Sequence, residues 1–295
     1  FDRIDHTWLM RFVEHRIGDR RILRLIRKWL KAGVLEEGTW SATEAGTPQG
    51  AVISPLLANI YLHYVYDLWV QAWRRRVAEG DVIVLRYADD TIVGFQHEDE
   101  ARRFLTDLRE RLARFGLDLH PAKTRLIAFG RFVVERRRAR GERRPPTFEF
   151  LGFTHICGTK RNGRGFQLQR RTACRRKWAT VKRIGEVLRR MRHAPIDEQG
   201  RRLARMLEGH YAYFSVPTNN AAVRAVRHHV KIRWYRSLRR RSQRRRLTWR
   251  RMNVIVAKHL PKPRVLHPWP EQRFLVKHDR APGRGVRAPV LGGVR

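Results

Sequence analysis

Two short runs of β-prone residues flank an acidic pair in the first third of the chain, and they restrict the local fold more than any other feature. Residues 82–85 are Val-Ile-Val-Leu and residues 91–95 are Thr-Ile-Val-Gly-Phe, with Tyr87-Ala88-Asp89-Asp90 near the middle. β-branched and aromatic residues favour strands, and two such runs around a short polar stretch predict a β-hairpin. We therefore expect both carboxylates to stand exposed at its turn.

The segments around this hairpin carry helical periodicity. Ser54-Pro55 predicts an N-cap followed by a first-turn proline, and 98–115 ends a helical stripe at Gly116. Shorter helical patterns occupy 8–13 and 22–30, and 126–129 is expected to be a strand. The apolar positions of the helix after Ser54 are Leu56, Leu57, Ile60, Tyr61, Tyr64, Val65, Leu68 and Trp69. The predicted fold class is α+β, with helices packed on one side of a small antiparallel sheet.

The second half of the chain changes from strands to helices. Residues 148–153 and 165–168 are predicted strands around an Asn162-Gly163 turn, and helical patterns dominate from residue 170. Apolar residues four apart predict one long helix with arginines on its other faces; they are Val226, Val230, Trp234 and Leu238. The basic stretch 263–295 is rich in Gly and Pro without periodicity, so we expect it to be disordered.

The charge of the chain indicates a polyanionic partner. Its 65 Lys and Arg outnumber 27 Asp and Glu, which gives a net charge of +38. Residues 209–270 contain no acid at all, so the excess is concentrated in the helical half. A charge of this size favours nucleic acid before membrane, although a merely basic soluble protein is the alternative. Neither Cys157 nor Cys174 has zinc-site spacing, and both are interpreted as reduced thiols of a cytoplasmic protein.

Two motifs could carry chemistry. Adjacent carboxylates on a tight turn suit binding of two Mg²⁺ ions, because oxygen ligands there project into open space where phosphates can complete the shells. The loop Gly46-Thr47-Pro48-Gln49-Gly50 enters the helix at Ser54, so its backbone amides and the Gln49 amide could approach a nucleotide. Each motif also has an ordinary alternative, as a surface turn.

The order of the motifs resembles that of bacterial group II intron-encoded reverse transcriptase/maturases. The residues that carry the resemblance are Gly46-Thr47-Pro48-Gln49-Gly50, Ser54-Pro55-Leu56-Leu57-Ala58-Asn59-Ile60-Tyr61-Leu62, Arg86-Tyr87-Ala88-Asp89-Asp90, Gly116-Leu117-Asp118-Leu119-His120-Pro121-Ala122-Lys123-Thr124, Phe150-Leu151-Gly152-Phe153, Gly209-His210-Tyr211-Ala212-Tyr213-Phe214 and Trp234-Tyr235-Arg236-Ser237-Leu238. The series extends over almost the whole chain outside its C-terminal tail.

The resemblance implies an RNA-directed DNA polymerase that copies intron RNA into DNA and helps the intron to splice. It implies a right-hand polymerase palm with partial fingers at 1–145 and primer-grip-like strands at 146–169. A helical, RNA-binding thumb/maturase domain would follow at 170–262, and a basic tail at 263–295. Its partners would be intron RNA, an RNA template with a DNA primer, deoxynucleotide triphosphates and target DNA, in the bacterial cytoplasm and without a membrane.

The resemblance also implies roles for individual residues. Asp89 and Asp90 would bind two Mg²⁺ ions, with Tyr87 beneath them, and Lys123 would neutralise the departing pyrophosphate. The nucleotide would contact Phe1, as an aromatic gate, and Pro48, Gln49 and Gly50. The primer grip would be Phe150, Leu151, Gly152 and Phe153. The RNA-binding residues would be Trp234, Arg239, Arg240, Arg241, Arg244, Arg245, Arg246 and Trp249.

One departure from the family pattern concerns a further metal-binding Asp, which would lie a few residues before Phe1. Asp2 and Asp5 are not expected to replace it, because a shift along a strand re-aims the side chain. We therefore expect the chain alone to polymerise poorly or not at all. The alternatives are a non-enzymatic RNA-binding splicing maturase, a decayed remnant, or a reverse transcriptase of another retroelement class such as a retron.

Overall fold

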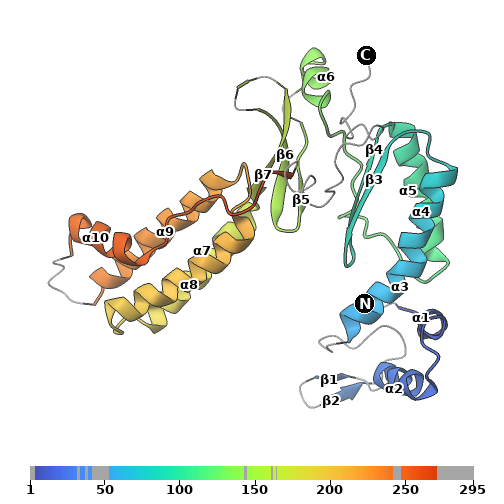
Figure 1. Ribbon diagram of the computed structural model, residues 1–295, viewed down its shortest axis with the longest axis horizontal. Coiled ribbons are helices and arrows are strands. Elements are labelled where there is room, and N and C mark those ends of the chain that lie inside the picture. Colours follow the sequence, from blue (N-terminus) through green and yellow to red (C-terminus); the bar gives the residue numbers. More distant parts are fainter. Residues whose placement is uncertain are drawn as a thin grey trace, which may run out of the picture. The chain divides into compact units, whose positions relative to one another are not determined.

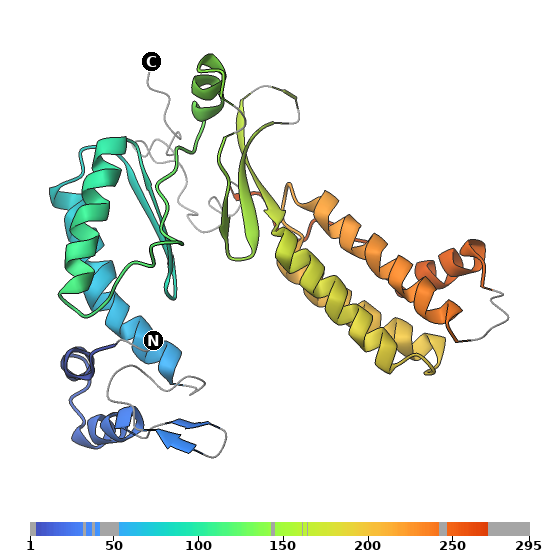
Figure 2. The same cartoon turned by 180° about the vertical axis from the view of Figure 1, so that it is seen from behind.

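The computed structural model describes residues 4–31, 34–36, 39–41, 53–142, 145–160, 162–163, 165–241 and 247–270, with backbone only at 31, 34–36, 39–41 and 138. The chain divides into two compact units, Phe1–Ile127 and Ala128–Arg295 (Figures 1 and 2). Both combine helices with antiparallel strands, in agreement with the predicted mixed fold class. None of the described helices is long and apolar enough to cross a membrane.

The first unit contains helices around a β-hairpin. In chain order its elements are α1 (His6–Glu14), α2 (Arg20–Lys31), β1 (Val34–Glu36), β2 (Thr39–Ser41), α3 (Ser54–Leu62), the π-helical segment η1 (His63–Asp67), α4 (Leu68–Arg76), β3 (Val82–Tyr87), β4 (Asp90–Phe95) and α5 (Glu98–Ala113). Strands β3 and β4 are antiparallel, with Val84 opposite Val93. This confirms the hairpin predicted from the two β-prone runs.

Helices α4 and α5 lie along one face of the β3–β4 hairpin (Figures 1 and 2). Val82 is buried there, and Trp73 and Phe104 pack edge to face with 5.0 Å between ring centroids. The predicted helix-on-sheet layer is therefore present. The strand expected at 126–129 is wrong: this stretch pairs with no described strand, and Leu126 is exposed. A β-prone run without a ladder partner gains no sheet hydrogen bonds.

Helices α3 and α4 form one rod that η1 interrupts. The helix begins at Ser54 and its N-cap position is Ile53, so the predicted Ser54 cap is wrong, while Pro55 does lie in the first turn. The buried face runs through Leu57, Tyr61 and Val65, then continues one position later. The buried positions that follow are Tyr66, within η1, and Val70 and Trp73, in α4. This shift explains why Leu68, expected in the apolar stripe, is exposed.

The second unit joins a three-stranded sheet to a helical bundle. Its elements are α6 (Val133–Ala139), β5 (Phe148–Phe150), β6 (Phe153–Thr159), β7 (Phe166–Thr172), α7 (Cys174–Arg190), α8 (Ile196–Phe214), α9 (Asn220–Arg239) and α10 (Trp249–His259). The strand order is β5-β6-β7 and all pairs are antiparallel. The single strand expected at 148–153 is wrong, because Leu151 and Gly152 turn the chain between β5 and β6.

Helices α7, α8 and α9 lie side by side and enclose the second core (Figure 1). The predicted four-residue stripe of α9 is confirmed, since its four members are all buried. At the centre, the indole of Trp234 donates a hydrogen bond to Oε1 of buried Gln199, 2.8 Å away.

Both cysteines are free thiols, as predicted, and burial raises the pKa of Cys157.

Candidate functional site

The acidic pair lies at the end of the β3–β4 hairpin. Tyr87 is opposite Asp90, so Ala88 and Asp89 form a two-residue turn, and Ala88 adopts a left-handed φ of +53°. Both aspartates are exposed, as the sequence predicted, and Tyr87 is 65% exposed. Neither carboxylate forms a hydrogen bond or ion pair with a described residue. The oxygens are therefore available to a ligand from outside the chain.

The guanidinium of Arg86 fixes the turn from behind. Its Nε and Nη2 each donate to the Asp67 carboxylate at 2.6 Å, which makes a bidentate pair. Its Nη1 donates to Oδ1 of Asn59 at 2.8 Å and to the carbonyl of Ala88 at 2.9 Å. The bonds to Asp67 raise the pKa of Arg86, while burial acts in the opposite direction. A bidentate pair of this kind defines orientation as well as position.

Sequence reasoning missed this four-residue cluster, which we call the Arg86 clamp: Asn59, Asp67, Arg86 and Ala88. Asp67 is the last residue of η1, whose π-type bond runs from the Leu68 amide to the His63 carbonyl. Carbonyls of this segment are satisfied from α5, because Arg111 donates to Tyr64 and Val65 at 3.3 and 3.1 Å. π-helical insertions are common at functional sites, but the sequence pattern alone gave no sign of this one.

Other predicted residues of this site have mixed placements. Lys123 is exposed, and its backbone amide donates a hydrogen bond to the His120 carbonyl. Phe1, Asp2, Pro48, Gln49 and Gly50 lie outside the described residues. Asp5 caps α1 by accepting from the Trp8 amide at 2.9 Å, which occupies a carboxylate oxygen that a metal would need.

The donor set at the turn fits part of a magnesium site. Carboxylate oxygens are the ligands that Mg²⁺ prefers, and an exposed pair leaves room for water and phosphate oxygens. Within the described ranges, no group of three or more His, Cys, Asp or Glu side chains could hold a metal ion. Asp89 and Asp90 would therefore provide only some of the ligands.

A second turn, between β5 and β6, carries the predicted primer-grip residues. Leu151 and Gly152 both have positive φ, +49° and +77°, as in the type I′ turns that suit two-residue hairpins. The hydroxyl of Tyr213 donates to the Leu151 carbonyl at 2.9 Å. Phe153 stacks on Tyr213 with 5.7 Å between centroids and contacts Phe214 at 5.2 Å. Two separate sequence motifs, at 150–153 and 209–214, thus meet in the structure.

The predicted RNA-binding residues of the second unit divide into surface and interior groups. Trp234 has no exposed surface, so its expected stacking role is corrected to a core role, bonded to Gln199. Arg241 is half-buried and donates to the Ala194 carbonyl, while burial lowers its pKa. The positions of Arg244, Arg245 and Arg246 lie outside the described residues.

Three of the predicted residues remain accessible. Trp249 is 44% exposed and stacks on Tyr235 with 3.9 Å between centroids, beside the ammonium group of Lys231. Arg240 is exposed, and Arg239 is half-buried with its guanidinium over the Tyr235 ring. An aromatic surface beside cations is suited to stacking of an unpaired base.

Two cationic grooves flank α7, and sequence reasoning assigned RNA binding to only one of their residues, Arg240. The groove against α9 has a volume of about 300 Å³ and is lined by Lys182, Gly185, Leu188, Arg189, Arg192, Arg233, Arg236, Ser237 and Arg240. A Cβ on Gly185 would lie 3.1 Å from an Arg233 nitrogen, so the missing side chain lets that arginine approach. The helical spacing of the α7 cations could have indicated this face.

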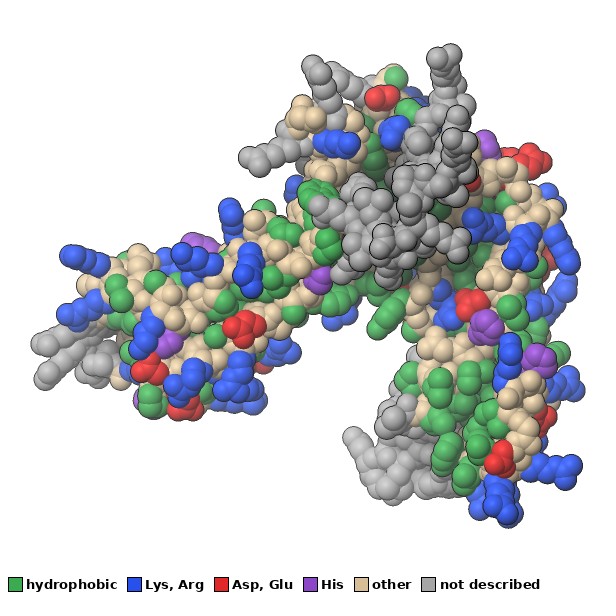
Figure 3. Space-filling view, viewed as in Figure 1, with side chains coloured by type: hydrophobic (Ala, Val, Ile, Leu, Met, Phe, Trp, Pro, Cys, Tyr) green, Lys and Arg blue, Asp and Glu red, His purple; other side chains and the backbone are tan. Residues whose placement is uncertain are grey.

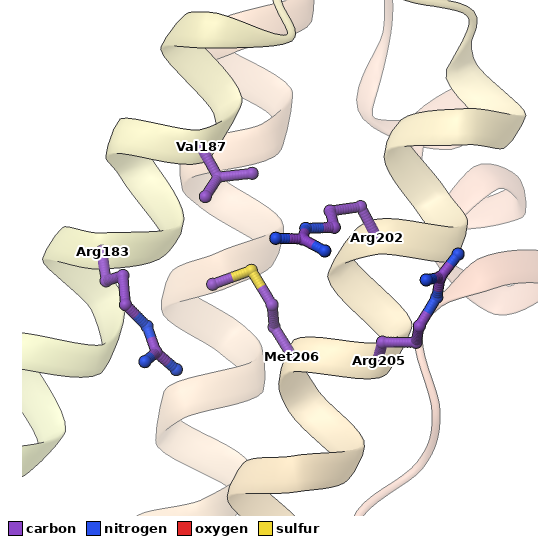
Figure 4. Close-up of a pocket in the computed structure, with 5 residues that line it drawn as sticks. All are labelled: Arg183, Val187, Arg202, Arg205 and Met206. Carbon is purple, nitrogen blue, oxygen red and sulfur yellow. The ribbon is translucent and has the colours of Figure 1, made fainter.

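The groove between α7 and α8 is about 340 Å³ and is drawn in Figure 4. Arg183 and Val187 come from α7, and Arg202, Arg205 and Met206 come from α8. Neither lining includes an acid, and Figure 3 shows Lys and Arg side chains along this helical region. Clustered cations without acids repel one another until a polyanion binds.

Comparison with known proteins gives one family match and several shorter matches to individual proteins. The profile of the family described as reverse transcriptase (RNA-dependent DNA polymerase) matches residues 1–155. The group II intron-encoded protein LtrA of Lactococcus lactis subsp. cremoris is 52% identical over 63 residues, 21% of this chain and 10% of LtrA. Protein YkfC of Escherichia coli is 36% identical over 120 residues, 32% of this chain and 31% of YkfC.

One fungal protein matches over the same length as LtrA. An uncharacterized 91 kDa protein in the cob intron of Schizosaccharomyces pombe is 49% identical over 63 residues. That match covers 21% of this chain and 8% of the fungal protein. The matched segments thus span a third or less of these relatives.

Proposed function

Since the family profile covers more than half of its length, the chain belongs to the reverse transcriptase family, and we propose that it carries the polymerase centre of a group II intron-encoded enzyme. The centre is the turn that bears Asp89 and Asp90. The observation that carries the proposal is this exposed carboxylate pair, which has no described partner and is held from behind by Arg86. The likeness to LtrA supports the assignment to intron-encoded proteins.

The proposed reaction is transfer of a deoxynucleotide to a DNA primer paired with RNA. The primer 3′-hydroxyl releases its proton to water and its oxygen forms a bond to the α-phosphorus, while the bond from that phosphorus to the bridging oxygen breaks and pyrophosphate leaves. Asp89 and Asp90 direct their oxygens to the side where the phosphates lie. Exposed Lys123 offers a cation to the pyrophosphate charge. Gln49, with Pro48, Gly50 and Phe1, is proposed to contact the nucleotide.

Mg²⁺, when bound, would neutralise phosphate charge and lower the pKa of the attacking hydroxyl. The two aspartates of the turn would supply oxygen ligands to it. Because neither carboxylate forms an ion pair with a described residue, no ion pair of this kind has to break before they bind. The turn at Leu151 and Gly152 is proposed to hold the primer strand, with the aromatic rings of Phe153 and Tyr213 fixing its shape.

The helical unit is proposed to bind intron RNA. Its acid-free grooves would receive backbone phosphates, and Trp249 would stack on a base. Such binding weakens steeply with salt, because each neutralised phosphate releases counterions. This surface supports the second candidate function, an RNA-binding splicing maturase that does not polymerise.

Primer extension on an RNA template tests the polymerase proposal, with the protein at the length its gene encodes. We expect Mg²⁺-dependent synthesis that chelation stops and Asp89→Ala abolishes. Asp99→Ala, which removes another exposed carboxylate, from α5, is the matched control and should retain synthesis. Synthesis that survives Asp89→Ala would refute the proposed centre. Splicing of the intron RNA without any synthesis would favour the maturase alternative.

A further inference from the structure

The exposed turn has an unusual requirement: its carboxylates must stay in place without side-chain contacts of their own. The carboxylates of Asp89 and Asp90 bond to no described residue, and Ala88 is held in a left-handed conformation that a residue with a Cβ rarely adopts. The two-residue loop therefore needs support from the backbone side. The only described side chain that bonds to it is Arg86, through the Ala88 carbonyl.

The geometry of the clamp makes it a rigid support. Four of the five guanidinium N–H groups of Arg86 are used, two of them on one carboxylate. The side chains of Arg86 and Asp67 are only 15% and 29% exposed, so solvent screens the pair weakly. Because the guanidinium is planar, fixing it on Asp67 also fixes the direction in which Nη1 meets the Ala88 carbonyl.

The position of Asp67 depends in turn on η1. This segment shifts the helical phase, so that Tyr66 enters the core while the next residue, Asp67, faces β3. Arg111 satisfies carbonyls on the α5 side of the same segment. The π-helical segment thus connects the helix core to the acidic turn through one ion pair.

We propose that Arg86 and Asp67 are positioning residues, which set the place and direction of the Asp89–Asp90 turn for catalysis through the Ala88 carbonyl. The proposal rests on the proposed polymerase function for its catalytic consequence alone. A purely structural alternative is that the pair only attaches β3 to the helix rod. The two alternatives predict different results for a variant in which β3 stays attached to the helix rod but the hydrogen bond to the Ala88 carbonyl is lost.

The double variant Arg86→Met with Asp67→Leu separates these readings. Replacing a buried ion pair by apolar residues of similar size is often neutral for stability, and methionine cannot donate to the Ala88 carbonyl. The matched control is Arg102→Met with Glu98→Leu, which removes an ion pair of the same chemistry from exposed positions on α5. The conservative single variant Arg86→Lys is measured beside them, in case the double variant does not fold.

The first measurement is the backbone ¹⁵N order parameter of residues 88–90 in the whole chain. We expect a fall from about 0.85 to below about 0.6 in the double variant and a smaller fall in Arg86→Lys. The order parameters of residues 151–152 should not change in either Arg86 variant. Those of residues 88–90 should not change in the control variant Arg102→Met with Glu98→Leu. Order parameters at 88–90 that stay at the wild-type value in both Arg86 variants would overturn the proposal.

The second measurement is steady-state primer extension by the protein at its gene-encoded length. We expect kcat to fall about tenfold in the double variant while KM for the primer–template stays unchanged, as for loss of one charge-assisted hydrogen bond. An equal kcat in the double variant and wild type would overturn the proposal. If wild type shows no synthesis, the polymerase function fails instead, and the order parameters still decide whether the clamp holds the turn.

Discussion

Two hairpin turns, one in each unit, have similar backbone conformations but are stabilised by different kinds of side chain. Each has two residues and a non-glycine residue with positive φ, Ala88 in one and Leu151 in the other. A carbonyl of each turn accepts one side-chain hydrogen bond, from Arg86 or from Tyr213. Behind the first lies an ion pair, and behind the second lies a cluster of aromatic rings.

The difference follows from what each turn presents. A turn that exposes two carboxylates to water cannot also be covered by apolar rings, so a buried cation holds it through the backbone. The turn at Leu151 presents no charge, and Phe153 with its neighbours can pack directly against it. The ion pair supports the first turn and leaves its carboxylates accessible to solvent. The aromatic rings support the second turn by covering one side of it. Four changes test this contrast, from the largest expected effect to the smallest.

Phe153→Ala should have the largest effect. Phe153 is only 9% exposed and contacts both Tyr213 and Phe214, so its removal leaves a cavity beneath the turn. We expect the free energy of unfolding of the second unit to fall by roughly 3–5 kcal/mol, by native-state hydrogen exchange. Phe153→Leu, which retains most of the volume, is the control and should lose much less. A loss below 1 kcal/mol, on the order of a surface change, would contradict aromatic support.

Asp67→Ala should be next. It leaves the Arg86 guanidinium unpaired at a mostly buried position, so the first unit should lose roughly 2–4 kcal/mol of unfolding free energy, measured in the same way. Glu98→Ala breaks the exposed pair with Arg102 and should change stability by less than about 0.5 kcal/mol. Equal losses in the two variants would show that the clamp contributes no more than a surface ion pair.

Acid should weaken the aromatic support. Burial, and to a smaller extent the charge of Arg183, lowers the pKa of His210 from 6.5 to about 4, and its ring lies 4.6 Å from that of Phe214. Between these values the unfolded chain binds a proton that the folded unit does not, so stability present above pH 6.5 is lost as the pH falls toward 4.

The loss attributable to His210 should reach roughly 1–3 kcal/mol, measured by urea unfolding of wild type and His210→Gln at several pH values. The difference between the two proteins should vary with pH only in this window. A constant difference would show that His210 titrates alike in the folded and unfolded states.

Ala88→Gly should have the smallest effect. Glycine adopts a φ of +53° without the strain of a Cβ, although it has more freedom to lose on folding. We expect a stability gain within about 1 kcal/mol and unchanged order parameters at 88–90, since the bond from Arg86 to the carbonyl remains. A rise in mobility at this turn would mean that the Ala88 side chain, and not the clamp, restricts it.

Local patterns in the sequence predicted the elements whose causes are local. The stripe of α9 and the β3–β4 hairpin follow from helical spacing and from β-prone runs, and both are present. The exposed acidic pair was predicted for the same reason. The turn at Leu151 was missed, because leucine seldom has positive φ and the aromatic residues that support it lie in α8, some sixty positions away.

The clamp could not be predicted because its members are dispersed. Arg86 lies 19 residues from Asp67 and 27 from Asn59, and their meeting depends on how the helix rod packs on the hairpin. Trp234 shows the same limit. A tryptophan among arginines suggested a stacking surface, but its partner Gln199 lies 35 residues earlier and places it in the core.

The π-helical segment also determines what a one-codon deletion in the gene would do. Removing one codon within residues 63–67 would leave an uninterrupted α-helix in which Leu57, Tyr61, Val70 and Trp73 still share one face, because η1 absorbs a single extra residue. Val70 and Trp73 would then remain in the core, and a loss would be confined to the Arg86 clamp, whose Asp67 is the last residue of η1. A copy of the gene that lacks one of these codons should therefore keep its helix core, and the order parameters of residues 88–90 would show whether the clamp survives.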